Sequence, residues 1–187
     1  MRPDLVSAQR LTMTTDRFSA FVAAELESAR NDPFDADARI REWLDDVEAL
    51  YRQVESFLAA FTASGAIRLE RRPTTLNEEF LGTYEISRLV IEIGPKQVEL
   101  RPIGALIFGA HGRVDLIGPR DSRKLVLVDK AASRARIRVL GEEDVEREKR
   151  NPPPPPTWAW KFSEGPRRDY VELDERAFKE AVLAVAS

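Results

Sequence analysis

Histidine and cysteine, from which many catalytic and metal sites are built, are scarce in this sequence. Its 187 residues include no cysteine and one histidine, His111. A disulfide, a thiolate nucleophile and a zinc site of the usual Cys/His type are therefore excluded. His111 lies between Ala110 and Gly112, where a glycine-rich bend could expose an imidazole that titrates near neutral pH. It is a candidate general base, or a loop histidine without a chemical role.

A second candidate lies in two consecutive apolar segments, residues 112–117 with Asp115 and residues 125–130 with Lys130. The pair resembles the strands of restriction-endonuclease-like nucleases, in which an acid on one strand and an acid-x-Lys motif on the next hold a divalent metal. Asp115 matches the first acid and Lys130 the lysine, but Val128 stands where the second acid should be. The resemblance covers about twenty residues and implies a nuclease, or a degenerate relative that binds nucleic acid without cutting it. Otherwise Asp115 is an outward-facing strand residue.

Charge is distributed unevenly along the chain. Residues 1–65 contain 12 acids and 7 bases, a local charge of −5, whereas residues 111–140 contain 8 bases and 3 acids, a local charge of +5. Arg134, Arg136 and Arg138 alternate, and with Arg123 and Lys130 they form a candidate strip for phosphate or nucleic-acid contact. The same charges could instead protect a sheet edge from pairing, or face the acidic part of the fold.

The composition limits the classes of function. A net charge of −3 gives no general reason to expect nucleic acid or an anionic membrane as a partner. The sequence has no phosphate-binding GxxxxGK or GxGxxG motif, no membrane-length apolar run and no secretory signal at its start. We therefore predict a cytosolic protein without a cofactor, a bound metal or a membrane association. The excess of arginine over lysine is typical of a GC-rich bacterial genome.

Helical periodicity dominates the first third of the chain. A first helix is predicted after Thr14 or Thr15, and a second from Asp32-Pro33 to Gly65, a residue suited to a left-handed C-cap. The second helix carries a wide apolar stripe: Ile40, Val47, Val54 and Phe61; Trp43, Leu50 and Phe57; and Leu44, Tyr51 and Leu58. Such a stripe is typical of a helix packed on a sheet or in a bundle, and a dimerising helix is the alternative.

From residue 66 the period changes from 3.6 to 2, which predicts strands. A short strand at 67–69 should end at Arg72-Pro73, and further strands are expected at 84–93, from 98, near 114–116, at 125–128 and at 137–139. Residues 104–109 fit a buried strand or a tight bend. The short connections predict an antiparallel meander of roughly five to seven strands.

The last part of the chain returns to the fold after a strap. A charged run, 142–150, precedes five prolines, 152–156, which form a semi-rigid spacer or, alternatively, a docking motif. Trp158, Trp160 and Phe162 then alternate on one face of a predicted strand, either as core or as a platform for stacking and partner contact. Asp174 is the expected N-cap of a last helix.

These patterns predict a single α+β domain over residues 1–187: a helical hairpin (1–65), an antiparallel meander (66–140), a charged and polyproline strap (141–157), and a returning strand with a C-terminal helix (158–187). The helices should cover one face of the sheet. The sequence favours a non-enzymatic assembly or recognition module of a bacterial cytosolic system, bound to a protein partner or to a second copy. The expected partner contacts are Trp43, Tyr51, Trp158 and Trp160. A nucleic-acid-binding or degenerate nuclease domain is the alternative.

Overall fold

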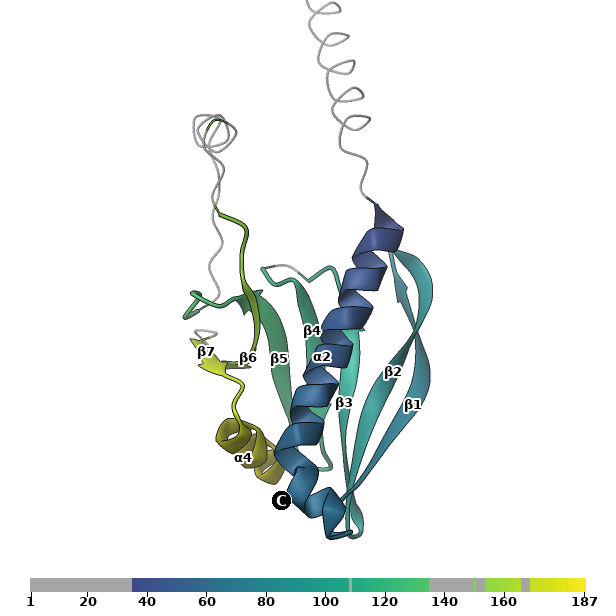
Figure 1. The fold of residues 1–187 in the computed structure, drawn as a ribbon, viewed down its shortest axis with the longest axis vertical. Coiled ribbons are helices and arrows are strands. Elements are labelled where there is room, and N and C mark those ends of the chain that lie inside the picture. The colour runs from purple at the N-terminus through teal and green to yellow at the C-terminus, as the bar shows by residue number, and fades with distance from the viewer. Residues whose placement is uncertain (1–34, 108, 135–149, 151–153, 166–168) are drawn as a thin grey trace, which may run out of the picture. The chain divides into compact units, whose positions relative to one another are not determined.

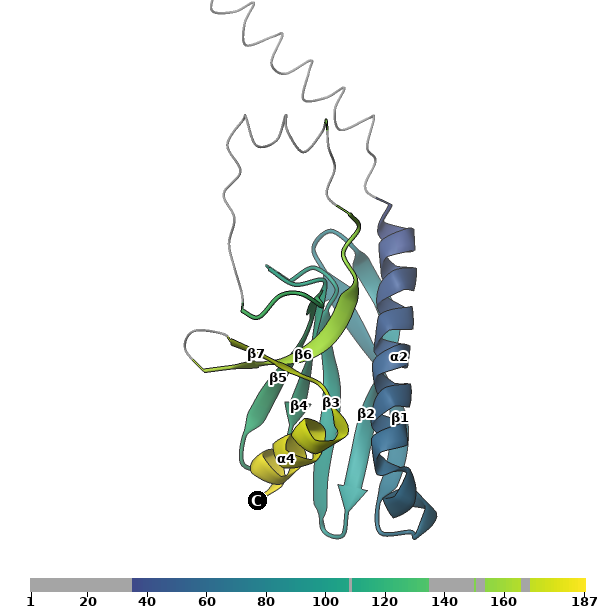
Figure 2. The ribbon, with the colours of Figure 1, turned by 60° about the vertical axis from the view of Figure 1, so that its left-hand side comes forward.

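An open antiparallel sheet with two helices packed on one face makes up the described part of the chain (Figures 1 and 2). The computed structural model describes residues 35–107, 109–134, 150, 154–165 and 169–187. Residues 36–187 form one compact unit. The helices are α2 (Ala36–Ala63) and α4 (Glu175–Ala186), and the strands are β1 (Arg68–Glu78), β2 (Gly82–Ile93), β3 (Lys96–Gly104), β4 (Gly112–Ile117), β5 (Ser122–Asp129), β6 (Trp158–Glu164) and β7 (Asp169–Glu172).

The seven strands follow one another in space in the order of the sequence, and every neighbouring pair is antiparallel. The predicted α+β class and antiparallel meander are therefore confirmed. Residues 105–107 and 109–111, between β3 and β4, form a bend with a single bridge between Ile107 and Ala110, and not a strand. The predicted first helix and the predicted strand at 137–139 lie outside the described residues, so a helical hairpin is not shown.

The apolar stripe of α2 packs on the sheet as the sequence predicts. Six of its members, Trp43, Val47, Leu50, Tyr51, Val54 and Leu58, are at most 3% exposed and belong to the main core. Phe61 departs from the prediction because it is 42% exposed at the end of the helix. Helix α4, capped by Asp174 as predicted, adds Phe178, Val182 and Val185 to the same core. None of the described helices has the length and apolarity needed to cross a membrane.

Strand β1 is longer than predicted. It continues through Pro73, which pairs with Ser87 of β2, and ends at Glu78. The backbone N–H groups of a central strand donate to neighbours on both sides, and proline lacks this N–H. Strand β1, however, is an edge strand of the sheet and has a neighbour on one side only. The missing donor can therefore face outward, and the proline does not end the strand.

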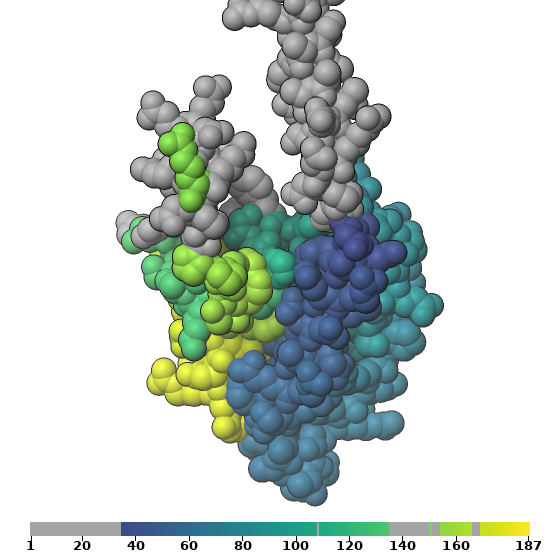
Figure 3. Space-filling model, turned by 45° about the horizontal axis from the view of Figure 1, so that its top comes forward, coloured from purple at the N-terminus to yellow at the C-terminus, as the bar shows by residue number. Residues whose placement is uncertain are grey.

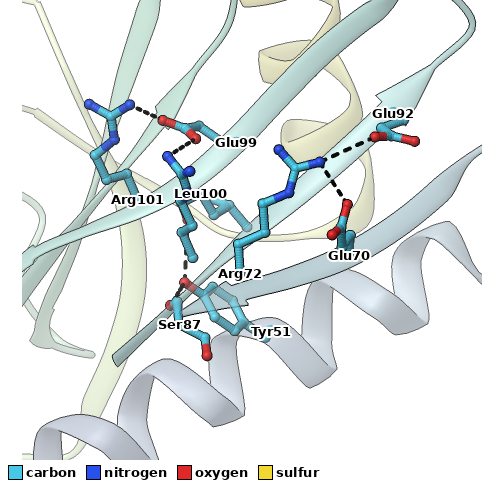
Figure 4. A network of polar contacts seen from close by, with 9 residues as sticks. Tyr51, Glu70, Arg72, Ser87, Glu92, Glu99, Leu100 and Arg101 are labelled. Carbon is cyan, nitrogen blue, oxygen red and sulfur yellow. Dashed lines mark hydrogen bonds and ion pairs between the residues drawn. The ribbon is translucent and has the colours of Figure 1, made fainter. Parts of the chain in front are cut away.

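Tyr51 closes a gap between β2 and β3. These strands pair over five residue pairs next to their turn, the last being Leu89 with Leu100. Where the pairing ends, the Tyr51 hydroxyl lies 2.7 Å from the Ser87 carbonyl oxygen and 3.3 Å from the Leu100 carbonyl oxygen (Figure 4). Burial raises the pKa of Tyr51, so the phenol stays neutral and can donate. The sheet opens here without leaving both carbonyls unpaired.

Ion pairs cover the sheet face that points away from the helices at β1–β3 (Figure 4). Arg88 lies 3.2 Å from Glu99, Arg101 also binds Glu99, and Arg72 lies 2.7 Å from Glu70. Because most of these side chains are partly solvated, ion pairs of this kind contribute little to the free energy of unfolding. This part of the sheet thus presents charges that are already matched to one another.

Candidate functional site

The loops at one end of the sheet line an open cavity, which is the candidate functional site. The antiparallel order brings together the β3–β4 loop, the residues after β5 and the start of β6, with the first turns of α2 beside them (Figure 3). The cavity has a volume of about 630 Å³, within the usual range for small-ligand sites. Its lining residues are Gly109, Ala110, His111, Val128, Asp129, Ala131, Ala132, Ser133, Arg134, Trp158 and Tyr170.

A stacked aromatic pair forms one wall of this cavity. The rings of His111 and Trp158 lie with their centroids 4.2 Å apart and their planes within 9° of parallel. Trp158 is 41% exposed, so much of its indole remains accessible. Burial, and secondly the Arg39 guanidinium, lower the pKa of His111. The nearest acid, Asp46, lies 4.0 Å from Nε2, which is too long for a hydrogen bond. The stack is therefore formed by a neutral imidazole at neutral pH.

The lowered pKa of His111 predicts a pH dependence of stability. As the pH falls from about 7.5 to about 5.5, the unfolded chain takes up the histidine proton first, because its pKa is near the ordinary value of about 6.5. Protonation of His111 therefore lowers the free energy of unfolding as the pH falls, so the wild type should lose more stability than His111→Gln over this range. Urea denaturation across this range measures both slopes. Burial raises the pKa of Asp46, which acts in the opposite sense, but this acid is present in both proteins. Equal slopes would contradict the prediction.

The loop that carries His111 is fixed by two buried or half-buried charges. Nη2 of Arg39 in α2 donates to the Ala105 carbonyl at 3.1 Å and to the His111 carbonyl. The Glu78 carboxylate at the end of β1 accepts from the amides of Ala105 and Leu106 at 3.0–3.1 Å. One loop is thus held by a cation on its carbonyls and an anion on its amides, which is the kind of support that preorganises a binding site.

A buried lysine fixes the turn after β5, which also lines the cavity. Lys161, which is 4% exposed, donates from Nζ to the carbonyls of Lys130 at 2.7 Å and Ala132 at 2.9 Å. The Asp129 carboxylate accepts from the Ala131 amide in the same turn at 2.8 Å. The cavity walls therefore rest on side chains from β1, α2 and β6 that do not themselves line the cavity.

Replacing Lys161 with methionine should lower the free energy of unfolding by about 1.5–3 kcal/mol, because two carbonyls lose a charged donor. Lys179→Met is a matched control, since Lys179 is half-exposed and makes surface contacts, an i,i+4 pair with Glu175 and a cation–π contact with Phe61 at 5.0 Å from the ring centroid. Its cost should stay below about 1 kcal/mol. Urea denaturation of both variants measures the difference, and equal costs would refute the role assigned to Lys161.

The nuclease-like residues do not come together. Asp115 is buried and is held by Arg113 through two hydrogen bonds of 2.7 Å. Its backbone partner on β5 is Lys124, with which it makes no ion pair, whereas Lys130 lies beyond the end of β5. Val128, at the position of the second acid, is buried. Within the described part of the chain, no three acidic or histidine side chains are grouped so as to hold a metal ion.

The predicted basic strip is only partly described. Arg123 lies 3.8 Å from both Asp121 and Glu164, and Lys130 and Arg134 are exposed. Arg136 and Arg138 lie outside the described residues. No ion pair among the residues that the structure describes joins a lysine or arginine of residues 113–134 to α2. The basic stretch therefore does not neutralise the acidic helix there.

Of the four expected partner contacts, three are core residues. Trp43, Tyr51 and Trp160 are at most 9% exposed and pack within their own domain, so they are not free to meet a partner. Of the four, only Trp158 is exposed. It is the first residue of β6, where a strand was predicted. The sequence interpretation missed Arg39 and Lys161. Arg39 lies four residues before Trp43, on the same helix face, and this spacing is a signal that could have revealed its burial.

Comparison with protein-family models, with curated proteins and with solved structures finds no match to this chain.

Proposed function

We propose that this domain is a non-enzymatic recognition module that binds a partner protein at the end of the sheet where the His111–Trp158 cavity lies. The observation that carries the proposal is the cavity itself, which combines an exposed stacked aromatic wall with a loop held by Arg39 and Glu78. A preorganised pocket lets a partner place one apolar side chain with little loss of conformational entropy.

Three large apolar side chains are exposed at this end of the sheet. Phe80 in the β1–β2 turn is 71% exposed, Leu106 in the β3–β4 loop is 39% exposed, and Trp158 at the start of β6 is 41% exposed. The turn and the loop are neighbours because Glu78 binds the Leu106 amide. Large apolar side chains exposed at the same end of a domain as a cavity support a docking surface there.

The proposal predicts that partner binding depends on Trp158. A photo-crosslinking amino acid at position 80 should capture a partner that the same amino acid at position 183, at the other end of the domain, does not capture. With the purified partner, Trp158→Ala should weaken binding by about 30-fold, the size expected of a hot-spot residue. Leu183→Ala is the matched control, because Leu183 is 64% exposed on α4, and its affinity should change less than about twofold.

Two results would count against this function. One is equal crosslinking of the same proteins from positions 80 and 183. The other is a purified partner that binds Trp158→Ala as tightly as the wild type, measured by calorimetry. Either would show that the cavity end of the sheet does not provide the contact surface.

A further inference from the structure

The cations near the cavity are exposed and unmatched. Lys124, Lys130 and Arg134 are exposed, and within the described residues none of their side chains makes a hydrogen bond or an ion pair. Arg134 lines the cavity, and Lys130 lies between two of its lining residues, Asp129 and Ala131. The one lining carboxylate, Asp129, already accepts the Ala131 amide. This contrasts with β1–β3, where the charges pair with one another.

A second cavity continues from the first. Its volume is about 350 Å³, and it shares Gly109, Ala110 and Tyr170 with the first cavity. Its charged lining residues are Arg113, Arg123, Lys124 and Glu164. Arg113 is held by Asp115, and Arg123 lies 3.8 Å from Glu164, so Lys124 is the unmatched charge here. An extended chain that leaves the aromatic wall can therefore pass Tyr170 toward a second positive group.

We infer that the occupant of these joined cavities is an acidic segment of a partner protein. Its apolar anchor enters beside Trp158, and carboxylates on neighbouring residues face Arg134, Lys130 and Lys124. This inference rests on the proposed function and names the chemistry of the partner. Charges at the rim of an interface act mainly on partner choice and association rate, and the anchor supplies most of the affinity.

The surroundings favour an acidic peptide over a nucleic acid. Nucleic-acid affinity depends on neutralising several phosphates in a row. Acids of α2 also lie near this end of the sheet. Asp46 lies 4.0 Å from His111, and Glu42 and Asp45 are close to Asp46. A long polyphosphate would meet these acids, whereas one or two carboxylates beside an anchor need only the three unmatched cations.

Selection from a display library of random peptides of about twelve residues tests the inference directly. The wild-type domain is the bait, and Trp158→Ala serves for counter-selection. Enriched peptides should carry an aromatic or aliphatic residue flanked by Asp or Glu. Selection on Arg134→Glu should shift the flanking residues toward Lys and Arg. Arg176→Glu, an exposed charge on α4, is the matched control and should leave the preference unchanged.

Synthetic peptides with the selected sequences allow the affinity to be measured. They should bind the Arg134→Glu domain about fivefold more weakly than the wild-type domain. Their affinity for the wild type should also fall about fivefold when the salt concentration rises from about 50 to about 300 mM. Two outcomes would overturn the inference and leave the proposed function standing. In one, the selected peptides depend on Trp158 but are not enriched in Asp or Glu. In the other, Arg134→Glu selects the same flanking residues as the wild type. Absence of Trp158-dependent enrichment would overturn both. Tighter, Trp158-dependent binding of labelled oligo(dT) or oligo(U) would assign the site to nucleic acid instead.

Discussion

Replacing Gly112 with alanine is expected to lower the free energy of unfolding by about 3 kcal/mol, the upper part of the range for overpacking a core. A Cβ at this position would lie 2.3 Å from Cζ3 of Trp43 and 2.8 Å from Cε3. The indole cannot move aside easily, because Trp43 is fully buried and lies against Trp160 with ring centroids 6.0 Å apart. Gly112 is itself fixed in β4 opposite Leu127. Chemical denaturation followed by circular dichroism measures the loss.

A double-mutant cycle separates this contact from the general cost of replacing a glycine. Trp43→Phe shortens the ring that faces Gly112, so Gly112→Ala should cost at least about 1 kcal/mol less in that background. Gly94→Ala is the control, because Gly94 has a φ of 56° and no atom within 4 Å of an added Cβ. Its cost should be about 1–2 kcal/mol, from backbone strain alone. Identical costs of Gly112→Ala in both backgrounds would show that Trp43 is not the obstacle.

Much of the fold could be predicted because its signals are local in sequence. The wide stripe of α2 predicts the burial of Trp43 and Leu50, and Gly65, with a φ of 74°, follows the helix as expected. Short turns predict the meander. The prediction failed at Pro73, which resembles a strand end when the edge position of β1 is not known. Whether a strand lies at the edge is a property of the whole sheet.

The candidate site could be predicted only in part, for the same physical reason. The sequence singles out His111 and Trp158 by residue type, but they lie 47 positions apart and stack only because β4 and β6 flank β5. Lys161 alternates outward between two core aromatics, which indicates a solvated lysine; the turn after β5 folds back over it and provides carbonyl acceptors. A side chain that supports a site by binding the backbone of a distant loop has no partner residue type that the sequence could reveal.

Replacing Arg39 with methionine is expected to lower the free energy of unfolding by about 2–4 kcal/mol and to abolish Trp158-dependent binding. The variant keeps the apolar stem but leaves the carbonyls of Ala105 and His111 without their donor in a buried setting. The loop that carries His111 should then lose its fixed position. Hydrogen exchange of residues 105–111 should accelerate more than exchange in the β4–β5 turn at the far end of the sheet.

Arg39→Lys shows whether the charge or the shape of the side chain matters. An ammonium keeps the positive charge and can donate to two carbonyls, as Lys161 does, but the lysine side chain is one atom shorter than the path to Nη2 of arginine and does not place its donor at the same point. Exchange in the loop should therefore be intermediate between wild type and Arg39→Met, and peptide affinity should follow the same order. If Arg39→Met slowed or left unchanged the exchange of residues 105–111, the loop would be fixed without the guanidinium, by Glu78 and by the hydrogen bond from the His111 amide to the Leu127 carbonyl. Binding would then not depend on the guanidinium, and the cavity would be preorganised by the sheet rather than by α2.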